Sequence, residues 1–354
     1  MIVANSHKTE IQEIIKDFLK SDETKPKVYR SNIFRKEDLE PGGGIENLHT
    51  RSFLKVQDGC NSFCSFCVIP YARGKSRSLS VRDIIKRITE LLNAGVREIV
   101  LTGIHIGDYF DDEVGADFTE LVRRVLGETA VPRLRLSSFE PIEVSVDLLK
   151  LFSDERLCPH FHMSIQSAST KVLSDMKRKY SAEQVRASLE QIKAYVPQAF
   201  IGMDVIAGFP TESKSHFEES FLNLVASPWS KIHVFPYSER QGTKAALISE
   251  KVDLRERKMR ARRLRELSDE RLSRCAHKQL GTIKKVLLLR GATHGAQGLS
   301  RDYFSVDFSL NSSEQGASEL NALAGQEVRA EIMAIRNREG REPQLLAKNL
   351  GVLQ

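Results

Sequence analysis

The sequence predicts an α/β protein in which a parallel sheet of six strands is followed by a small antiparallel β-barrel. Six apolar, strand-like segments alternate with helical patterns between residues 51 and 235. A strongly basic helix follows, and residues 280–354 then consist of short strands separated by turn-rich segments. A chain of 354 residues is long enough for one large and one small domain, which we place at 51–279 and 280–354.

The larger domain shows the alternation typical of β–α units. The clearest helical pattern begins at Ser80, a capping residue with Asp83 three positions later, and ends at Gly95. Strands that alternate with helices form parallel sheets, which leaves an open doubly wound sheet or a partial (β/α)6 barrel. The strand-like segments are 53–56, 98–102, 133–137, 160–165, 200–207 and 231–235.

The C-terminal part combines a basic helix with a barrel-like pattern of strands. The helix spans 254–278 and carries seven arginines and lysines within residues 255–265. A solvated helical face explains such a charge run equally well. The formal net charge of +6 nevertheless favours an anionic partner, with nucleic acid as the first candidate. Small antiparallel barrels often bind nucleic acid, and the expected strands are 283–289, 303–308, 326–336 and 344–347.

The N-terminal segment reads as a short strand followed by an amphipathic helix over residues 1–20. A strand at the first residue needs a partner, and the next fifty residues offer none by their pattern. We therefore expect residues 1–24 to be the end of a domain whose front is missing from the sequence, and 25–50 to be a linker. The alternative is a helical N-terminal arm. The apolar face of the helix comprises Ile11, Ile14, Ile15 and Phe18.

The cysteines indicate a metal site in a cytoplasmic protein. There are five, an odd number, and three of them crowd into residues 60–67. A secreted disulfide framework would use an even set spread along the chain. We find no apolar run of membrane-spanning length and no signal peptide, so we expect no membrane association.

The clustered cysteines, Cys60, Cys64 and Cys67, form a C-x3-C-x2-C loop. Thiolates suit iron–sulfur clusters and zinc. Three cysteines can hold three irons of a [4Fe-4S] cubane and leave the fourth iron to chelate S-adenosylmethionine (SAM), whose reductive cleavage yields a 5′-deoxyadenosyl radical. A structural zinc ion is the alternative, but it requires four ligands, and no cysteine or histidine near the loop supplies the fourth.

Polar and glycine-rich segments follow each later strand, where catalytic groups of parallel β–α folds collect. Each segment alone is a weak signal that turns or packing explain equally well, but their shared location strengthens it. Glycine in such places lets the backbone approach a ligand closely. The segments are 102–105, Ser138 with Glu140, Gln166 with Ser167, 208–212 and 236–238.

Four histidines are further candidates for a role in the larger domain. His160 and His162 alternate along one strand and therefore share a face, while His105 and His233 follow or occupy other strands. Without ligand spacing, we expect packing or hydrogen bonding to substrate instead of metal binding. Cys158 is expected to be a buried free thiol.

These motifs resemble those of the radical SAM methylthiotransferases, from about residue 51 to the C-terminus. The likeness includes VQDGCNSFCSFCVIPYARGKSRS, GVREIVLTGIHIGDY, RLRLSSFEP, SIQSAS, DVIAGFP and HVFPYSERQGT. LTGIHIGDY and PYARGKSRS are most similar to the branch that acts on N6-threonylcarbamoyladenosine 37 of tRNA. The resemblance implies a partial (β/α)6 radical SAM barrel and a C-terminal TRAM-like, RNA-binding barrel.

The resemblance also implies the chemistry. The family replaces the C2 hydrogen of adenosine 37 with a methylthio group, using two SAM molecules and an electron donor such as flavodoxin or ferredoxin. Cys60, Cys64 and Cys67 match the ligands of the SAM cluster, and Gly103, Gln166 and Gly208 are expected to contact SAM.

Two departures from the family pattern leave alternatives open. Family members begin with a domain that carries three more cysteines, and none precedes Cys60 here. Thr211 and Ala168 stand where the family usually has glycine, which affects close approach to SAM. The alternatives are a branch acting on isopentenyladenosine in tRNA or on a ribosomal-protein aspartate, or an RNA-binding remnant without catalysis. The intact cysteine triad favours the enzyme.

Overall fold

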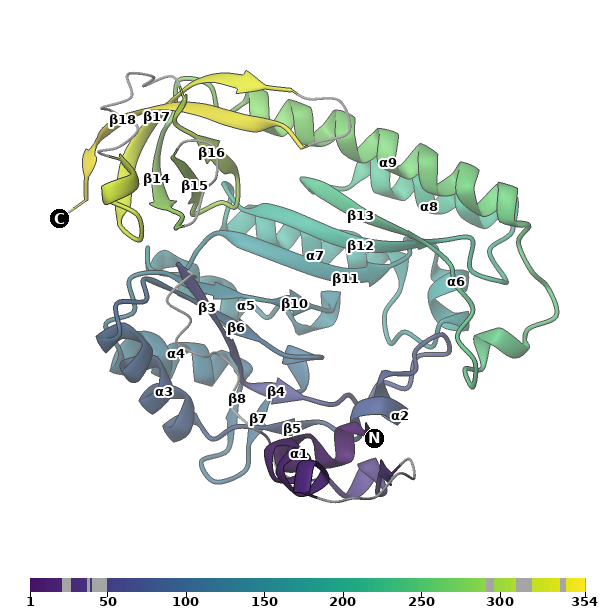
Figure 1. The fold of residues 1–354 in the computed structure, drawn as a ribbon. Coiled ribbons are helices and arrows are strands. Elements are labelled where there is room, and N and C mark those ends of the chain that lie inside the picture. The colour runs from purple at the N-terminus through teal and green to yellow at the C-terminus, as the bar shows by residue number, and fades with distance from the viewer. Residues whose placement is uncertain are drawn as a thin grey trace.

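The structure is a computed structural model that describes residues 1–20, 27–36, 39, 50–290, 296–309, 320–337 and 342–353. Among these residues, no helix is both long and apolar enough to cross a lipid bilayer. Figure 1 shows a curved sheet with helices on its outer side and a small barrel at one end.

The curved wall consists of two parallel sheets that follow one another along the chain. The first has the order β3-β6-β9 and the second β10-β11-β12-β13, and only Ser137 separates β9 from β10. All six predicted strands form, and the expectation of a partial (β/α)6 barrel is confirmed (Figure 1). The bounds are β3 Arg51–Lys55, β6 Glu98–Thr102, β9 Leu134–Leu136, β10 Ser138–Phe139, β11 His160–Gln166, β12 Phe200–Ala207 and β13 Lys231–Pro236.

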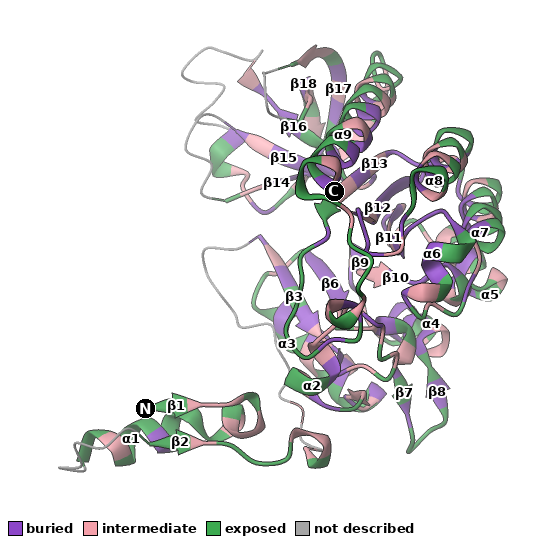
Figure 2. Cartoon of the chain, turned by 90° about the vertical axis from the view of Figure 1, so that its right-hand side faces the viewer, coloured by how far each residue is buried: buried purple, intermediate pink, exposed green. Residues whose placement is uncertain are grey.

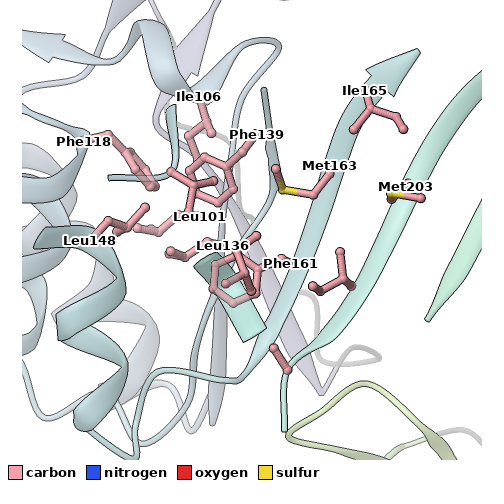
Figure 3. Close-up of a cluster of buried hydrophobic side chains, with 14 of the residues drawn as sticks. Leu101, Ile106, Phe118, Leu136, Phe139, Leu148, Phe161, Met163, Ile165 and Met203 are labelled. Carbon is pink, nitrogen blue, oxygen red and sulfur yellow. The ribbon is translucent and has the colours of Figure 1, made fainter. Parts of the chain in front are cut away.

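Helices cover the outer face because each carries an apolar stripe toward the sheet. Figure 3 shows Phe118 and Leu148, from two of these helices, in one buried cluster with Leu101 and Phe161 of the strands. The larger helices are α3 Val81–Asn93, α4 Phe118–Glu128, α7 Ala182–Tyr195, α8 Lys214–Ala226 and α9 Leu254–His277; the shorter ones are α2 Ile69–Arg73, α5 Val146–Lys150 and α6 Thr170–Asp175. Short antiparallel pairs are β4 Gln57–Asp58 with β5 Arg77–Ser78, and β7 Phe110–Asp111 with β8 Ala116–Asp117.

The predicted C-terminal barrel is closed, with the strand order β14-β15-β16-β18-β17. One strand, β15, was not expected, because its four residues contain Gly298 and show no apolar alternation. The glycine is required there: a Cβ atom at this position would lie 2.4 Å from Cγ1 of Val286 on the neighbouring strand. The bounds are β14 Ile283–Leu288, β15 Gln297–Ser300, β16 Ser305–Asp307, β17 Glu327–Arg336 and β18 Gln344–Val352.

The N-terminal segment corrects one expectation. β1 (Ile2–Val3) pairs in parallel with β2 (Val28–Tyr29), so the stretch that follows does supply a partner strand. A two-residue strand leaves no pattern that the sequence could reveal. The amphipathic helix forms as α1 (Ile11–Lys20), and Figure 2 shows this segment beside the main body. The proposed boundaries at 24 and 50 stay a prediction, since much of 21–49 lies outside the described residues.

The basic helix α9 is less available to a partner than its sequence suggests. Arg257 and Arg260 are buried and pair with Glu239 and Glu212, at 2.8 and 2.9 Å. Arg263 is half-buried and pairs with a glutamate of α8. Within the charge run 255–265, the cations that remain exposed are Arg255, Lys258, Arg262 and Arg265.

A buried ionic network joins the sheet to the C-terminal barrel. Glu98 on β6 is fully buried and accepts hydrogen bonds from Arg133 at 2.8 Å and Arg135 at 3.1 Å. Arg133 also contacts Glu327 of the barrel, which Arg301 binds at 2.6 Å. Burial by itself would raise the pKa of Glu98, but the two arginines of the sheet lower it to about 2.

We predict that Glu98→Gln destabilises the protein by roughly 3 kcal/mol at pH 7, because a carboxylate with a pKa of about 2 in the folded state and 4.5 in the unfolded state contributes that much. The contribution is complete above pH 4.5 and is lost as the pH falls toward 2. Urea unfolding at several pH values measures it. Glu128→Gln, at an exposed pair with Arg124, is the matched control. Equal losses for both variants would contradict the prediction.

Candidate active site

The three clustered cysteines lie in the loop between β4 and α2, at the carboxyl end of the parallel strands. All three line one cavity of about 160 Å³. Its walls also include Ser138, Ser164 and Gln166, which follow or end other strands. The predicted meeting of the cysteine loop with the strand ends is therefore present in the structure.

The ligand atoms around the thiols bear on the choice between the two kinds of metal site. One zinc ion with Zn–S bonds of about 2.3 Å holds its sulfur ligands within about 4 Å of one another. Among the described residues, no group of three or more cysteine, histidine or acidic side chains whose ligand atoms all lie within 4.8 Å of one another includes two of the cysteines. In a cubane, by contrast, each thiolate binds a different iron.

The cysteine loop is fixed by one buried glutamine that the sequence did not single out. Nε2 of Gln57 donates to the carbonyl of Gly59 at 2.8 Å, and its Oε1 accepts from the backbone N–H of His105 at 2.9 Å. Gly59 has a φ of 78°, and a Cβ atom there would lie 2.0 Å from the carbonyl oxygen of Lys75. The loop thus requires glycine at its first turn.

Two cationic side chains contact the thiols. Nδ1 of His105 lies 3.7 Å from Sγ of Cys60, and Nη1 of Arg178 donates to Sγ of Cys64 at 3.3 Å. Arg178 is held in turn by Glu140 at 3.0 Å. These donors favour the thiolate, which is the form that binds metal.

The pKa values follow from these contacts. Burial alone lowers the pKa of His105, but hydrogen bonds to Asp108, Cys60 and Glu143 outweigh it and raise the pKa to about 12. For Cys60, burial by itself raises the pKa of the thiol. The hydrogen bonds from His105 and Ser62 outweigh burial, so the pKa of Cys60 is lowered overall. Burial raises the pKa of Cys67.

Residues 54–224 match the Radical SAM superfamily. The chain is 38% identical to the threonylcarbamoyladenosine tRNA methylthiotransferase MtaB of Aquifex aeolicus over 291 residues. These aligned residues cover 82% of this chain and 70% of that protein. The chain belongs to the MtaB-like radical SAM methylthiotransferases. Membership of the radical SAM superfamily implies a [4Fe-4S] cluster and SAM.

Two further comparisons complete this picture. The tRNA-2-methylthio-N(6)-dimethylallyladenosine synthase of Desulfotalea psychrophila is 36% identical over 245 residues, 67% of this chain and 55% of that protein. The chain therefore spans little more than half the length of that relative. Among solved structures, coproporphyrinogen III oxidase (HemN) from Escherichia coli has a TM-score of 0.45 and 14% identity, over 76% of this chain and 69% of that one.

Of the three residues expected to contact SAM in this methylthiotransferase, one lines the cysteine cavity and two do not. Gln166 lines the cysteine cavity and has a φ of 63°, a backbone conformation that a glutamine rarely adopts. Gly103 packs against Gln57, and Gly208 packs against Arg257, where a Cβ atom would lie 2.4 Å from Cγ. Neither glycine is among the residues that line the cavity, so their contact with SAM stays a prediction.

Thr211 and Ala168, which replace glycines of the family pattern, each form a hydrogen bond within the chain. The hydroxyl of Thr211 donates to Asp175 at 2.5 Å. The backbone N–H of Ala168 donates to Ser220 at 3.0 Å. Neither residue lines the cysteine cavity.

Arg178 belongs to the site although no pattern in the sequence points to it. It lies beyond α6, and only the folding of that segment over β11 brings it to the thiols. Its side chain is also bound to the hydroxyl of Tyr180 at 2.7 Å and to the carbonyl of Ser164 at 2.8 Å. A charged side chain with this many partners is rigid, but spacing in the sequence gives no sign of it.

We predict that the anaerobically reconstituted protein holds about four irons per chain, the number in one cubane. Cys64→Ala should remove most of this iron, the brown colour and SAM cleavage, because the cluster loses one of its three thiolates. Cys275→Ala, a partly exposed cysteine on α9, is the control and should keep the iron. Stoichiometric zinc without iron in anaerobically purified protein would contradict the prediction.

Proposed function

We propose that this chain takes part in the methylthiolation of tRNA at C2 of N6-threonylcarbamoyladenosine 37. The observation that carries the proposal is the convergence of three cysteines on a cavity at the strand ends, in a chain related over most of its length to an enzyme named for this reaction. A small β-barrel and an exposed basic face of α9 supply a surface suited to RNA.

In this proposal Cys60, Cys64 and Cys67 bind the cluster. When bound, the cluster and SAM supply the 5′-deoxyadenosyl radical that removes the C2 hydrogen of the adenine. Arg178 and His105 hold the thiols in the binding-competent form, and Gln57 fixes the loop that carries them. Gln166 and Ser164 line the space next to the cysteines, where SAM would lie.

The partners follow from the same proposal. We expect tRNA as the substrate, a flavodoxin or ferredoxin as the electron donor, and the cytoplasm as the location. RNA binding alone does not require a cavity lined by three cysteines, or a histidine and an arginine that contact two of the thiols. The enzyme is therefore the better interpretation.

The experiment that tests this proposal measures the transfer of the C2 hydrogen of adenine 37 to 5′-deoxyadenosine. tRNA that carries threonylcarbamoyladenosine with deuterium at C2 of adenine 37 is incubated with reduced, reconstituted protein and SAM. We expect deuterium to appear in 5′-deoxyadenosine, because the radical removes the atom from C2. Mass spectrometry measures it, together with any methylthio product. Deuterium transfer from dimethylallyladenosine tRNA and none from the threonylcarbamoyl substrate would assign the chain to the other branch.

We also predict the salt dependence of tRNA binding. We replace three exposed cations of α9 with glutamine: Arg255→Gln, Lys258→Gln and Arg262→Gln. The slope of log K against log salt should become smaller in magnitude by about 2 to 3, because each of the three lost phosphate contacts contributes about 0.7 to 0.9. Filter binding at four salt concentrations measures the slope. A control with three exposed cations of α3 and α4 replaced, Arg82, Lys86 and Arg123, should leave it unchanged. Equal effects of both triple variants on the slope would contradict the prediction that α9 binds RNA.

A further inference from the structure

A second, larger cavity lies at the other end of the barrel interior. It measures about 550 Å³ and is bounded by strands of the sheet and by the C-terminal barrel. From the sheet it is lined by His160 and His162 of β11 and by Lys231 and His233 of β13. From the barrel it is lined by Tyr303 and its neighbours. This volume is typical of sites for small organic groups.

The two cavities adjoin each other inside the barrel. Along β11, His160 and His162 line the larger cavity, while Ser164 and Gln166, on the same face, line the cysteine cavity. Ser138 lines both. Two residues along a strand span about 7 Å. A ligand whose reacting atom lies in the cysteine cavity can therefore place a substituent of that length among the histidines.

The larger cavity contains polar groups without a hydrogen-bond partner in the part of the chain that the structure describes. Oγ of Ser137 and Nδ1 of His160 are buried and lack a hydrogen-bond partner among the described residues. Both side chains line the cavity. An unsatisfied buried polar atom costs about 1 to 3 kcal/mol, so such atoms require an explanation. A polar ligand provides one.

The remaining polar groups are held in place by their neighbours. Nε2 of His162 lies 2.9 Å from Oδ2 of Asp204, and the rings of His162 and His233 are 5.4 Å apart. Burial and the nearby Lys231 lower the pKa of His233, which leaves a neutral imidazole with one donor and one acceptor. Lys231 is held at the rim by the exposed Glu342.

Packing between the domains explains only part of this arrangement. The ring of His160 stacks on Tyr303 with centroids 3.9 Å apart, and the guanidinium of Arg135 lies 4.9 Å from the centroid of the same tyrosine. This accounts for the position of the His160 ring. It does not account for the open volume, for Ser137 or for His233 on the far strand.

We propose that this larger cavity is the specificity pocket for the N6 substituent of the substrate, and that it takes a threonylcarbamoyl group. The inference rests on the proposed function. A threonylcarbamoyl group carries a urea, a hydroxyl and a carboxylate, which match Ser137, His233 and Lys231. A dimethylallyl group offers no hydrogen bond and would leave these groups unpaired, which is a strong basis for discrimination.

Lys231 can change partners at little cost. Its ion pair with Glu342 involves a carboxylate whose side chain is 65% exposed, and exposed pairs contribute little to stability. The substrate carboxylate, inside the cavity and shielded from water, is the stronger partner. Glu342 then serves to keep the lysine at the rim while the pocket is empty.

The test compares three RNAs and five proteins. Anticodon stem-loops carry threonylcarbamoyladenosine, dimethylallyladenosine or unmodified adenosine at position 37, and their Kd values are measured with the reconstituted full chain. We expect the wild type to bind the threonylcarbamoyl form at least tenfold more tightly than the unmodified form. Lys231→Met and His233→Leu should reduce this preference to less than threefold without changing the Kd for the unmodified stem-loop, which also shows that both variants are folded.

Two matched variants serve as controls. Lys86→Met and His277→Leu change the same residue types at exposed positions of α3 and α9 and should keep the full preference. If the wild type prefers the threonylcarbamoyl form and both pocket variants keep that preference, the pocket is wrong and the proposed function stands. If the wild type prefers the dimethylallyl form or binds none of the RNAs, the proposed function fails, and the pocket inference fails with it.

Discussion

The arrangement of this protein depends on one buried carboxylate. Glu98 is fully buried and binds Arg133, which directly precedes β9, and Arg135 of β9. Arg133 also binds Glu327 of the C-terminal barrel. Removing one member of such a network leaves an uncompensated charge in the interior, so its members are mutually dependent. The network fixes the barrel at the amino ends of the strands. The cysteine loop lies at the opposite ends, and the polar interior between them is closed on the barrel side.

Much of the fold could be read from the sequence because local patterns determine it. The six predicted strands of the two parallel sheets follow from apolar runs separated by helical periodicity, and Ser80 caps its helix as expected, with Oγ accepting from the N–H of Asp83. The pairing of β1 with β2 and the strand β15 were missed, because two to four residues give no periodic signal. The charge run of α9 predicted a basic face, yet Arg257 and Arg260 are buried and pair with the exposed Glu239 and the buried Glu212. A sequence shows the charge but not its partner.

The candidate site divides in the same way. The spacing of Cys60, Cys64 and Cys67 predicted that the three thiols lie together, and all three line one cavity; their binding of a metal stays a prediction. His105 and Arg178 reach the thiols only through tertiary structure, and spacing gives no measure of such distances. Glycine was an ambiguous signal. At position 208 it makes room for the stem of an arginine, which the sequence alone cannot distinguish from room for a ligand.

An incomplete barrel also has two strand edges, and these carry a consequence for solubility. β3 and β13 each pair with a single neighbouring strand, and such edges can recruit a strand from another copy. On β13, Ser268 of α9 binds the backbone N–H and carbonyl of Ile232, which covers part of this edge. The chain counters this with charge and proline: β3 begins with Arg51 and ends with Lys55, and β13 begins with Lys231 and ends with Pro236. The opening that would admit an anionic RNA is therefore bordered by cations that discourage edge-to-edge aggregation, and one set of side chains serves both needs.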